Sequence, residues 1–180
     1  MKCFGIQKVF AVEYEMIDAI SGYFEMWVDN KAVCRFEKGN REWKYEWNLL
    51  YIVEWLSKNL TSILHEEEFP LPVSATSSIE FLNKSNEFDS DNLDEFETWF
   101  EKRQDWYFRH SWYSSRGGSY LADVMFRRVA DTIEIEWDNL NLYKEITFIN
   151  PKGLYYVNSN LFEQVIHDFV EDFMTENINN

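Results

Sequence analysis

The sequence predicts an α+β fold, an antiparallel sheet built from hairpins and packed with three main helices, in a single domain over residues 1–180. Two blocks with strand-like alternation and tight turns, residues 1–37 and 124–157, are separated and followed by segments with apolar residues at helical spacing. Hairpins join antiparallel strands, whereas parallel strands need long crossovers. The length of 180 residues fits the usual domain size of about 100–200 residues.

The N-terminal block predicts a β meander. Residues 4–14 are expected to form its first strand. Residues 23–28 and 32–36 are expected to pair across Asp29-Asn30, a dipeptide suited to a two-residue hairpin turn. Gly39-Asn40 then closes the meander.

Three segments predict the main helices. Residues 47–64 carry apolar side chains on two neighbouring faces, which is typical of a helix buried between layers. A second helix is expected from residue 93 to about residue 111, stopped by Gly117-Gly118. Asn160 is expected to start the last helix. A shorter helix is expected at residues 78–84, within a polar stretch that is otherwise irregular.

The second block predicts two more hairpins. Residues 124–129 and 132–137 are expected to pair across Ala130-Asp131, and residues 145–149 are expected to pair with residues 154–157. The second of these four strands alternates isoleucine and tryptophan with glutamate, which is the pattern of a half-buried strand.

The charge of the chain argues against two classes of partner. The chain has 32 acidic and 17 basic residues, for a net charge of −15. Affinity for nucleic-acid phosphates and for anionic membranes comes mainly from Lys and Arg, so direct binding to either is not expected. The excess of acid instead allows an acidic mimic of DNA that occupies a basic protein.

The chain is expected to be cytoplasmic. Its first residues lack the apolar run of a signal peptide, and no stretch approaches the length of about 18 apolar residues that would indicate a membrane span. Cys3 and Cys34 are too few for a disulfide scaffold and are expected to stay reduced.

The sequence contains no motif that predicts an enzyme, a metal site or a cofactor. His65-Glu66-Glu67-Glu68-Phe69 begins like a zinc-protease helix, but Phe69 stands where the second His ligand is needed. The glycine-rich phosphate loops and the G-x-S-x-G nucleophile motif are also absent. We therefore expect no bound zinc, no cofactor and no catalytic residue.

One segment departs from the acidic background. Residues 102–128 contain six basic and two acidic residues, whereas the rest of the chain has 11 basic and 30 acidic residues. Guanidinium groups, imidazole, rings and flexible backbone suit a phosphate or a carboxylate-rich peptide. The candidate binding residues are Arg109, His110, Trp112, Arg116, Gly117, Gly118, Arg127 and Arg128. The alternative is that these arginines pair internally with the acids of the chain.

Several short motifs resemble a bacterial domain family. They are Gly22-Tyr23-Phe24-Glu25 with Trp27, Tyr45-Glu46-Trp47 with Leu49-Leu50, Phe69-Pro70-Leu71-Pro72, Arg109-His110-Ser111-Trp112 with Arg116-Gly117-Gly118, and Phe126-Arg127-Arg128-Val129 with Ile133-Glu134-Ile135. Over residues 22–138 they are similar to an uncharacterised domain found N-terminal to ImmA/IrrE-type metallopeptidase domains. The His-Glu-x-x-His motif of that peptidase is absent here. The resemblance implies an accessory or sensing domain from a bacterial or phage regulatory or defence system.

The predicted function is that of a non-enzymatic module that binds a protein partner. The chain has 15 Phe, 10 Tyr and 8 Trp residues, and Trp and Tyr are enriched in binding hot spots. Exposure of some of four tryptophans would support an interface: Trp47, Trp55, Trp106 and Trp112. One alternative is a small-anion or nucleotide sensor that uses residues 109–118. A second alternative is the acidic DNA mimic.

Overall fold

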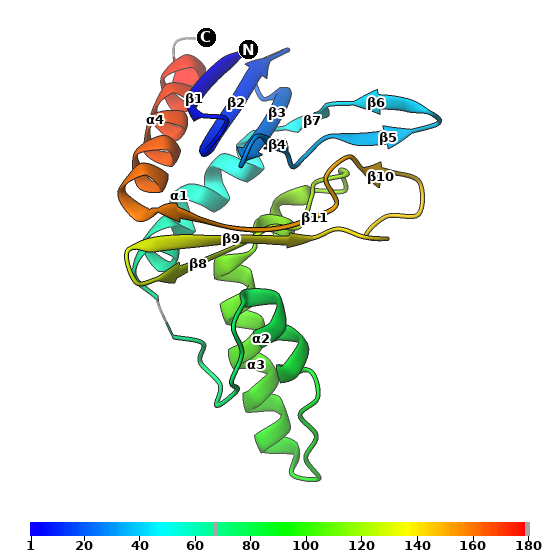
Figure 1. The fold of residues 1–180 in the computed structure, drawn as a ribbon, viewed down its shortest axis with the longest axis vertical. Coiled ribbons are helices and arrows are strands. Elements are labelled where there is room, and N and C mark those ends of the chain that lie inside the picture. Colours follow the sequence, from blue (N-terminus) through cyan, green and yellow to red (C-terminus); the bar gives the residue numbers. More distant parts are fainter. Residues whose placement is uncertain (67, 179–180) are drawn as a thin grey trace.

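A computed structural model describes residues 1–66 and 68–178 and has the predicted α+β architecture (Figure 1). In this part of the chain, the strands form three antiparallel sheets. In the largest sheet β1 to β4 follow one another in order, and β7 also pairs with β3. Its strands are β1 (Lys2–Ile6), β2 (Phe10–Met16), β3 (Ser21–Val28), β4 (Lys31–Ala32) and β7 (Tyr45–Asn48).

The two smaller sheets have three strands each in the described residues. One has the order β10-β5-β6, with β5 (Phe36–Lys38), β6 (Arg41–Trp43) and β10 (Thr147–Phe148). The other has the order β11-β9-β8, with β8 (Met125–Val129), β9 (Thr132–Asp138) and β11 (Lys152–Asn158).

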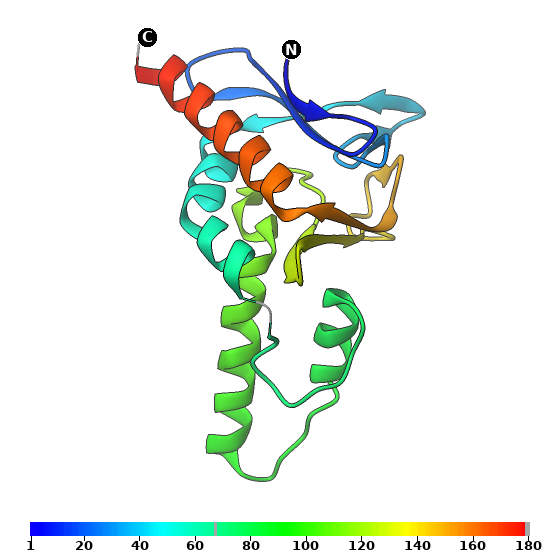
Figure 2. The ribbon, with the colours of Figure 1, turned by 60° about the vertical axis from the view of Figure 1, so that its left-hand side comes forward.

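Two helices cover the sheets and two form an arm that projects from them. α4 (Ser159–Ile178) lies against β1 and β2, and α1 (Leu50–His65) packs beside it. α2 (Ser78–Ser85) and α3 (Leu93–His110) extend away from the sheets (Figures 1 and 2). We call α2 and α3 the helical arm. A short 3-10 helix, η1 (Trp112–Arg116), follows α3 and contacts α1.

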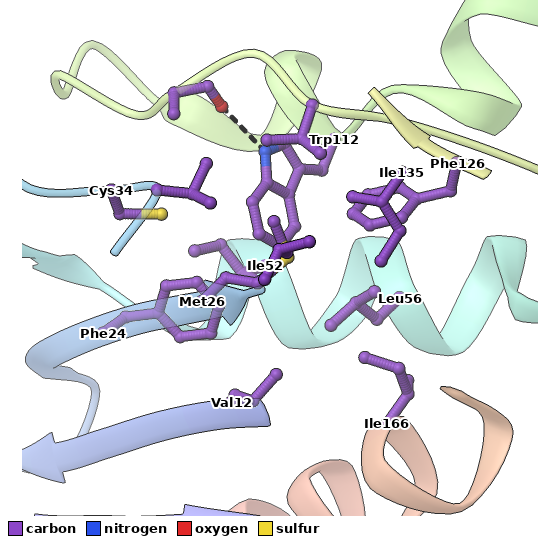
Figure 3. Packing of buried hydrophobic residues seen from close by; sticks show 14 of the residues in the cluster. Val12, Phe24, Met26, Cys34, Ile52, Leu56, Trp112, Phe126, Ile135 and Ile166 are labelled. Carbon is purple, nitrogen blue, oxygen red and sulfur yellow. Dashed lines mark hydrogen bonds between the residues drawn. The ribbon is translucent and has the colours of Figure 1, made fainter. Parts of the chain in front are cut away.

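The apolar core lies where the sheets meet α1 and α4. Figure 3 shows Phe24 of β3, Leu56 of α1, Ile135 of β9 and Ile166 of α4 around Trp112. The Trp112 indole is buried and donates a 2.7 Å hydrogen bond to the carbonyl of Ala122, which satisfies its one polar atom. A core built from residues this far apart in the chain joins both β blocks in one packing unit.

The tight turns form where the sequence predicts them. Asp29 and Asn30 have φ values of 51° and 61°, and Ala130 has a φ value of 50°. These left-handed values are the ones that two-residue hairpin turns require. The helices predicted at residues 78–84 and from residue 93 are also present, as α2 and α3.

The predicted first strand is wrong, because residues 4–14 form two paired strands, β1 and β2, rather than one. Residues 32–36 are likewise divided between β4 and β5. Gly39-Asn40 does not close the meander but forms the turn between β5 and β6. Pairing of these short strands depends on neighbours that local alternation does not specify.

Three other boundaries also differ from the prediction. The first helix begins at Leu50 rather than residue 47, because Trp47 lies in β7 and pairs with β3. α3 ends at His110, close to the expected residue 111, but its C-cap is Ser111 rather than Gly117-Gly118. The hairpin expected between residues 145–149 and 154–157 is absent from the described residues, because β10 pairs with β5 and β11 pairs with β9.

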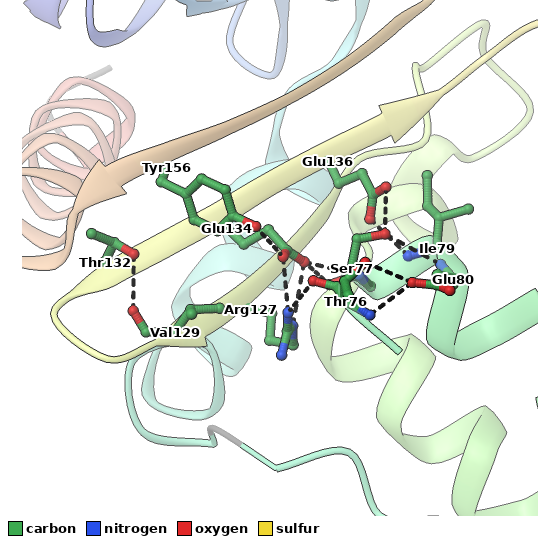
Figure 4. Close-up of polar contacts among 11 residues, drawn as sticks. Thr76, Ser77, Ile79, Glu80, Arg127, Val129, Thr132, Glu134, Glu136 and Tyr156 are labelled. Atoms are coloured by element: carbon green, nitrogen blue, oxygen red, sulfur yellow. Dashed lines mark hydrogen bonds and ion pairs between the residues drawn. The ribbon is translucent and has the colours of Figure 1, made fainter. Parts of the chain in front are cut away.

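A buried ion pair joins the helical arm to the sheets (Figure 4). Arg127 Nη2 of β8 lies 2.8 Å from Glu134 Oε2 of β9, and Arg127 Nε lies 3.3 Å from Glu134 Oε1. Ser78 of α2 donates to the same carboxylate from its backbone N–H at 2.9 Å and from its hydroxyl at 2.6 Å. Tyr156 of β11 donates to it at 3.1 Å. We call these four residues the Glu134 hub.

The glutamate face of β9 is therefore covered by α2, which leaves Glu134 buried and Glu136 half-buried. Glu136, two residues after Glu134 on the same face, accepts hydrogen bonds of 2.8 Å from the Ser77 hydroxyl and from the Ile79 backbone N–H. Both carboxylates point at the N-terminal turn of α2, where backbone N–H groups and the helix dipole favour negative charge.

We predict that Arg127→Ala destabilises the protein by roughly 3–5 kcal/mol, because it leaves the Glu134 carboxylate buried without its cation. Urea unfolding of both proteins measures the difference. Arg109→Ala is the matched control: Arg109 pairs with Glu66 at a half-exposed position, where such a pair contributes about 0–1 kcal/mol. Equal losses in the two variants would contradict a structural role specific to the Glu134 hub.

Candidate functional site

Besides Arg127, the structure buries two of the predicted binding residues. Trp112 is part of the core, with its ring packed against Phe24 and Phe126. His110 is also buried and stacks on Trp106, with ring centroids 4.5 Å apart. Burial lowers the pKa of His110 to about 4, so the imidazole is neutral at neutral pH. Both residues are therefore removed from the candidate site: neither presents a side chain to a partner.

Three of the predicted arginines are held by groups of the chain itself. Arg127 belongs to the Glu134 hub. Arg109 Nε lies 3.1 Å from Glu66 Oε1, and Arg109 Nη2 lies 3.2 Å from Glu66 Oε2. Arg128 donates to the backbone carbonyls of Leu64 and Ala130. These three arginines therefore fit the alternative to a binding role, in which they pair with other groups of the same chain.

The last part of the predicted segment reaches the surface beside the β5–β6 hairpin. The Arg116 guanidinium lies over the Tyr113 ring, 4.3 Å from its centroid. Gly117 has a φ value of +53°, and a Cβ there would lie 2.7 Å from Tyr51 Cε2 and 3.1 Å from Trp47 Nε1. The close contact and the left-handed conformation both require glycine. Gly118 lines the surface described next.

Two adjoining hollows lie between this loop and the β5–β6 hairpin. Their volumes are about 310 Å³ and 210 Å³, and Phe36, Glu46 and Tyr120 line both. We call the combined surface the aromatic groove. Its lining residues are Phe36, Lys38, Trp43, Lys44, Tyr45, Glu46, Trp47, Gly118, Ser119 and Tyr120.

The hairpin turn places Trp43 in the groove. Gly39 and Asn40 have φ values of +58° and +61° and reverse the chain between β5 and β6. Phe36 and Trp43 are paired across the hairpin, so both side chains lie on the same face. Phe36 is buried and supports the wall, whereas Trp43 is 49% exposed. The Trp43 indole donates to the Lys38 carbonyl at 3.3 Å.

Hydrogen bonds hold the opposite wall of the groove in place. The Tyr45 and Ser119 hydroxyls are 2.9 Å apart, which connects β7 to the loop. The Tyr143 hydroxyl donates to the carbonyls of Ser119 and Leu121 at 3.1 Å and 2.9 Å. Burial raises the pKa of Tyr143 and of Tyr45, so both hydroxyls stay protonated. The loop that presents Tyr120 is thereby fixed before any partner binds.

The groove combines rings with positive charge in an acidic chain. Lys38 Nζ lies 4.8 Å from the centroid of the Tyr120 ring, and Lys44 Nζ lies 5.7 Å from that of Tyr23. Both lysines are exposed, so their charges remain accessible to an acidic group. Glu46 is the acidic residue of the lining.

Two edge strands border the groove. Among the described strands, β6 pairs with β5 alone and β7 pairs with β3 alone. These strands follow each other in the chain and carry the exposed rings of Trp43 and Trp47. An edge strand presents unpaired N–H and C=O groups, to which an extended segment can add as a further strand.

The exposure expected for some of the four candidate tryptophans is found in one of them. Trp55, Trp106 and Trp112 are buried, and of the four candidates Trp47 alone is exposed, at 40%. Sequence reasoning missed Trp43, which is exposed within the charged stretch Arg41-Glu42-Trp43-Lys44. A large ring flanked by charges after a turn was the signal that could have identified it.

A buried carboxylate anchors the hairpin to the largest sheet. Glu25 of β3 accepts a 2.8 Å hydrogen bond from the Cys34 backbone N–H, just before β5, and its Oε2 lies 3.3 Å from Arg35 Nε. Burial is the main cause that raises the pKa of Glu25 from its ordinary value of 4.5 to about 7.

This shift predicts a pH dependence of stability. The folded protein keeps the Glu25 proton between pH 4.5 and about 7, where the unfolded chain releases it. The free energy of unfolding should therefore fall as the pH rises through this window. Glu25→Gln should remove about 2–3 kcal/mol of that fall, as measured by urea unfolding at several pH values. Exposed Glu54→Gln is the control. Parallel curves for the wild type and Glu25→Gln would contradict the assignment.

Within residues 1–66 and 68–178, no three His, Cys, Asp or Glu side chains form a group that could hold a metal ion. Glu67 of the His65–Phe69 stretch lies outside the described residues. No helix among the described residues is long and apolar enough to cross a membrane.

Comparison with models of known families, with curated proteins and with solved structures finds no match to this chain.

Proposed function

We propose that this chain is a non-enzymatic module that binds a protein partner through the aromatic groove. One observation carries the proposal: Trp43 and Trp47, 49% and 40% exposed, stand on consecutive edge strands beside two adjoining hollows. Exposed tryptophans over a preformed groove are typical of binding hot spots, because they bury a large area with few rotatable bonds.

The groove favours an extended segment with apolar and acidic residues. The edges of β6 and β7 supply backbone donors and acceptors for an added strand, and the hollows accept alternate side chains. Lys38 and Lys44 would pair with a carboxylate of that segment, since both are exposed and lack an acidic partner among the described residues. The negative charge of the rest of the chain would repel wrongly placed acidic partners.

The alternative of an anion sensor at residues 109–118 has weaker support. Such a sensor needs cationic groups that converge on one cavity. Arg109 is paired with Glu66, His110 is neutral and buried, and Arg116 lies over Tyr113. The groups that would have to act together are each occupied by a neighbour.

We further propose a regulatory or defence-related setting in a bacterium or a phage. This part rests on the resemblance of the motifs in residues 22–138 to the domain that precedes ImmA/IrrE-type peptidases. A module of that kind would sense or recruit a protein without cleaving it.

A peptide selection tests the binding proposal. Random peptides displayed on phage are selected on the immobilised wild-type protein, and their affinities are measured by calorimetry. The selected peptides should share an acidic residue flanked by apolar ones. Trp43→Ala and Trp47→Ala should each weaken their binding at least about tenfold, because each removes a central ring. Phe100→Ala, which removes an exposed ring of α3, should leave binding unchanged.

Two results would count against the proposal. Peptides that bind the tryptophan variants as tightly as the wild type would place the binding surface elsewhere. Basic peptides whose affinity falls steeply with salt, and which tolerate both tryptophan changes, would favour the acidic DNA mimic instead.

A further inference from the structure

A separate cavity of about 470 Å³ lies between the helical arm and the ends of β8 and β9. Leu82 of α2 and Met125 of β8 give it an apolar side, and Arg103 and Tyr107 of α3 give it a polar side. None of its lining residues lines the aromatic groove. Its volume lies within the range of about 300–1,000 Å³ that is usual for small-molecule sites.

Arg103 is the cationic group that lines this cavity. Its Nε donates a 3.0 Å hydrogen bond to the Ser85 hydroxyl, which turns the guanidinium towards α2. None of the described carboxylates forms an ion pair with it. Partial burial lowers the pKa of Arg103, because it disfavours the charged form of the guanidinium. A guanidinium in this state favours an anionic ligand.

The acids of the cavity wall, by contrast, already have partners. Asp123 accepts hydrogen bonds of 2.5 Å from the Ser111 hydroxyl and 2.8 Å from the Tyr107 hydroxyl. Asp138 lies 2.9 Å from the Lys152 ammonium. The two hydroxyls occupy the Asp123 carboxylate and Lys152 neutralises Asp138, so the guanidinium of Arg103 is the cationic group left for a ligand.

We propose that this cavity binds a small molecule that carries one anionic group on an apolar body. The anionic group, a carboxylate or a phosphate, pairs with Arg103, and the apolar body lies against Leu82 and Met125. Because the cavity lies between α3 and the strands, such a ligand contacts both and stabilises the docked position of the helical arm. This inference does not depend on the aromatic groove.

A pair of fluorescent dyes tests the proposal. 8-Anilinonaphthalene-1-sulfonate has an apolar body and one anionic group, and N-phenyl-1-naphthylamine has the same rings without the charge. The anionic dye should bind the wild type with a stoichiometry of one. Arg103→Gln should lower the affinity for the anionic dye at least about tenfold and change the affinity for the neutral dye less than about twofold. The reason is that only the anionic dye loses a charge-assisted hydrogen bond.

Matched variants separate binding at this cavity from other effects. Ser85→Ala removes the hydrogen bond to Arg103 but keeps the cation, so this variant should bind the anionic dye with the affinity of the wild type. Lys102→Gln alters the neighbouring cation of α3, which lines a different hollow, and Trp43→Ala alters the aromatic groove; both should also bind the dye with that affinity. Asn83→Trp adds a ring at the exposed cavity wall and should exclude both dyes. Circular dichroism melts verify that each variant folds.

The outcomes decide between the proposal and its alternatives. If Lys102→Gln or Trp43→Ala abolished binding of the anionic dye while Arg103→Gln left it unchanged, the proposal would be overturned and the dye would be assigned to another surface. An equal effect of Ser85→Ala and Arg103→Gln on both dyes would assign Arg103 a structural role only, and would overturn it too. Given the expected pattern, displacement of the dye by phenylacetate or by phenyl phosphate distinguishes a carboxylate ligand from a phosphate ligand.

Discussion

The buried carboxylate of Glu134 constrains more of this molecule than any other single group. It lies on β9, the middle strand of its sheet, and accepts hydrogen bonds from Ser78, Arg127 and Tyr156, which belong to α2, β8 and β11. A carboxylate removed from water is costly unless its lone pairs are satisfied. The three elements must therefore stay in register around it, and the helical arm is docked as a result.

The position of the arm in turn creates the cavity that contains Arg103. α2, held at its N-terminus by Glu134 and Glu136, carries Ser85 at its other end, where the hydroxyl accepts from Arg103 of α3. Glu25 has a similar role at the other end of the molecule, where it ties the start of the β5–β6 hairpin to β3. A buried carboxylate thus positions one border of each proposed binding surface: Glu134 positions the helical arm beside the cavity, and Glu25 positions the β5–β6 hairpin beside the aromatic groove.

The basic segment of residues 102–128 illustrates how an apparent binding motif is divided by folding. Its arginines do not act together: Arg127 is buried in the hub, Arg109 pairs with Glu66, and Arg103 lines a cavity without an ion pair to any described carboxylate. The aromatic groove is assembled instead from residues 36–47 and 118–120, which are distant in the sequence. A local excess of charge therefore identified a segment with several roles rather than one site.

Short-range features were determined by the sequence alone. The turns at Asp29-Asn30 and Ala130-Asp131, helix α3 and the α+β class follow from backbone preferences and spacing within a few residues. Strand partners and charge partners were decided only by the tertiary structure. β10 pairs with β5 across more than 100 positions, and Glu134 meets Ser78 across 56. Local preference acts between neighbours in the chain, whereas burial and electrostatic pairing act between neighbours in space, so the enclosure of Arg127 could not be predicted from spacing.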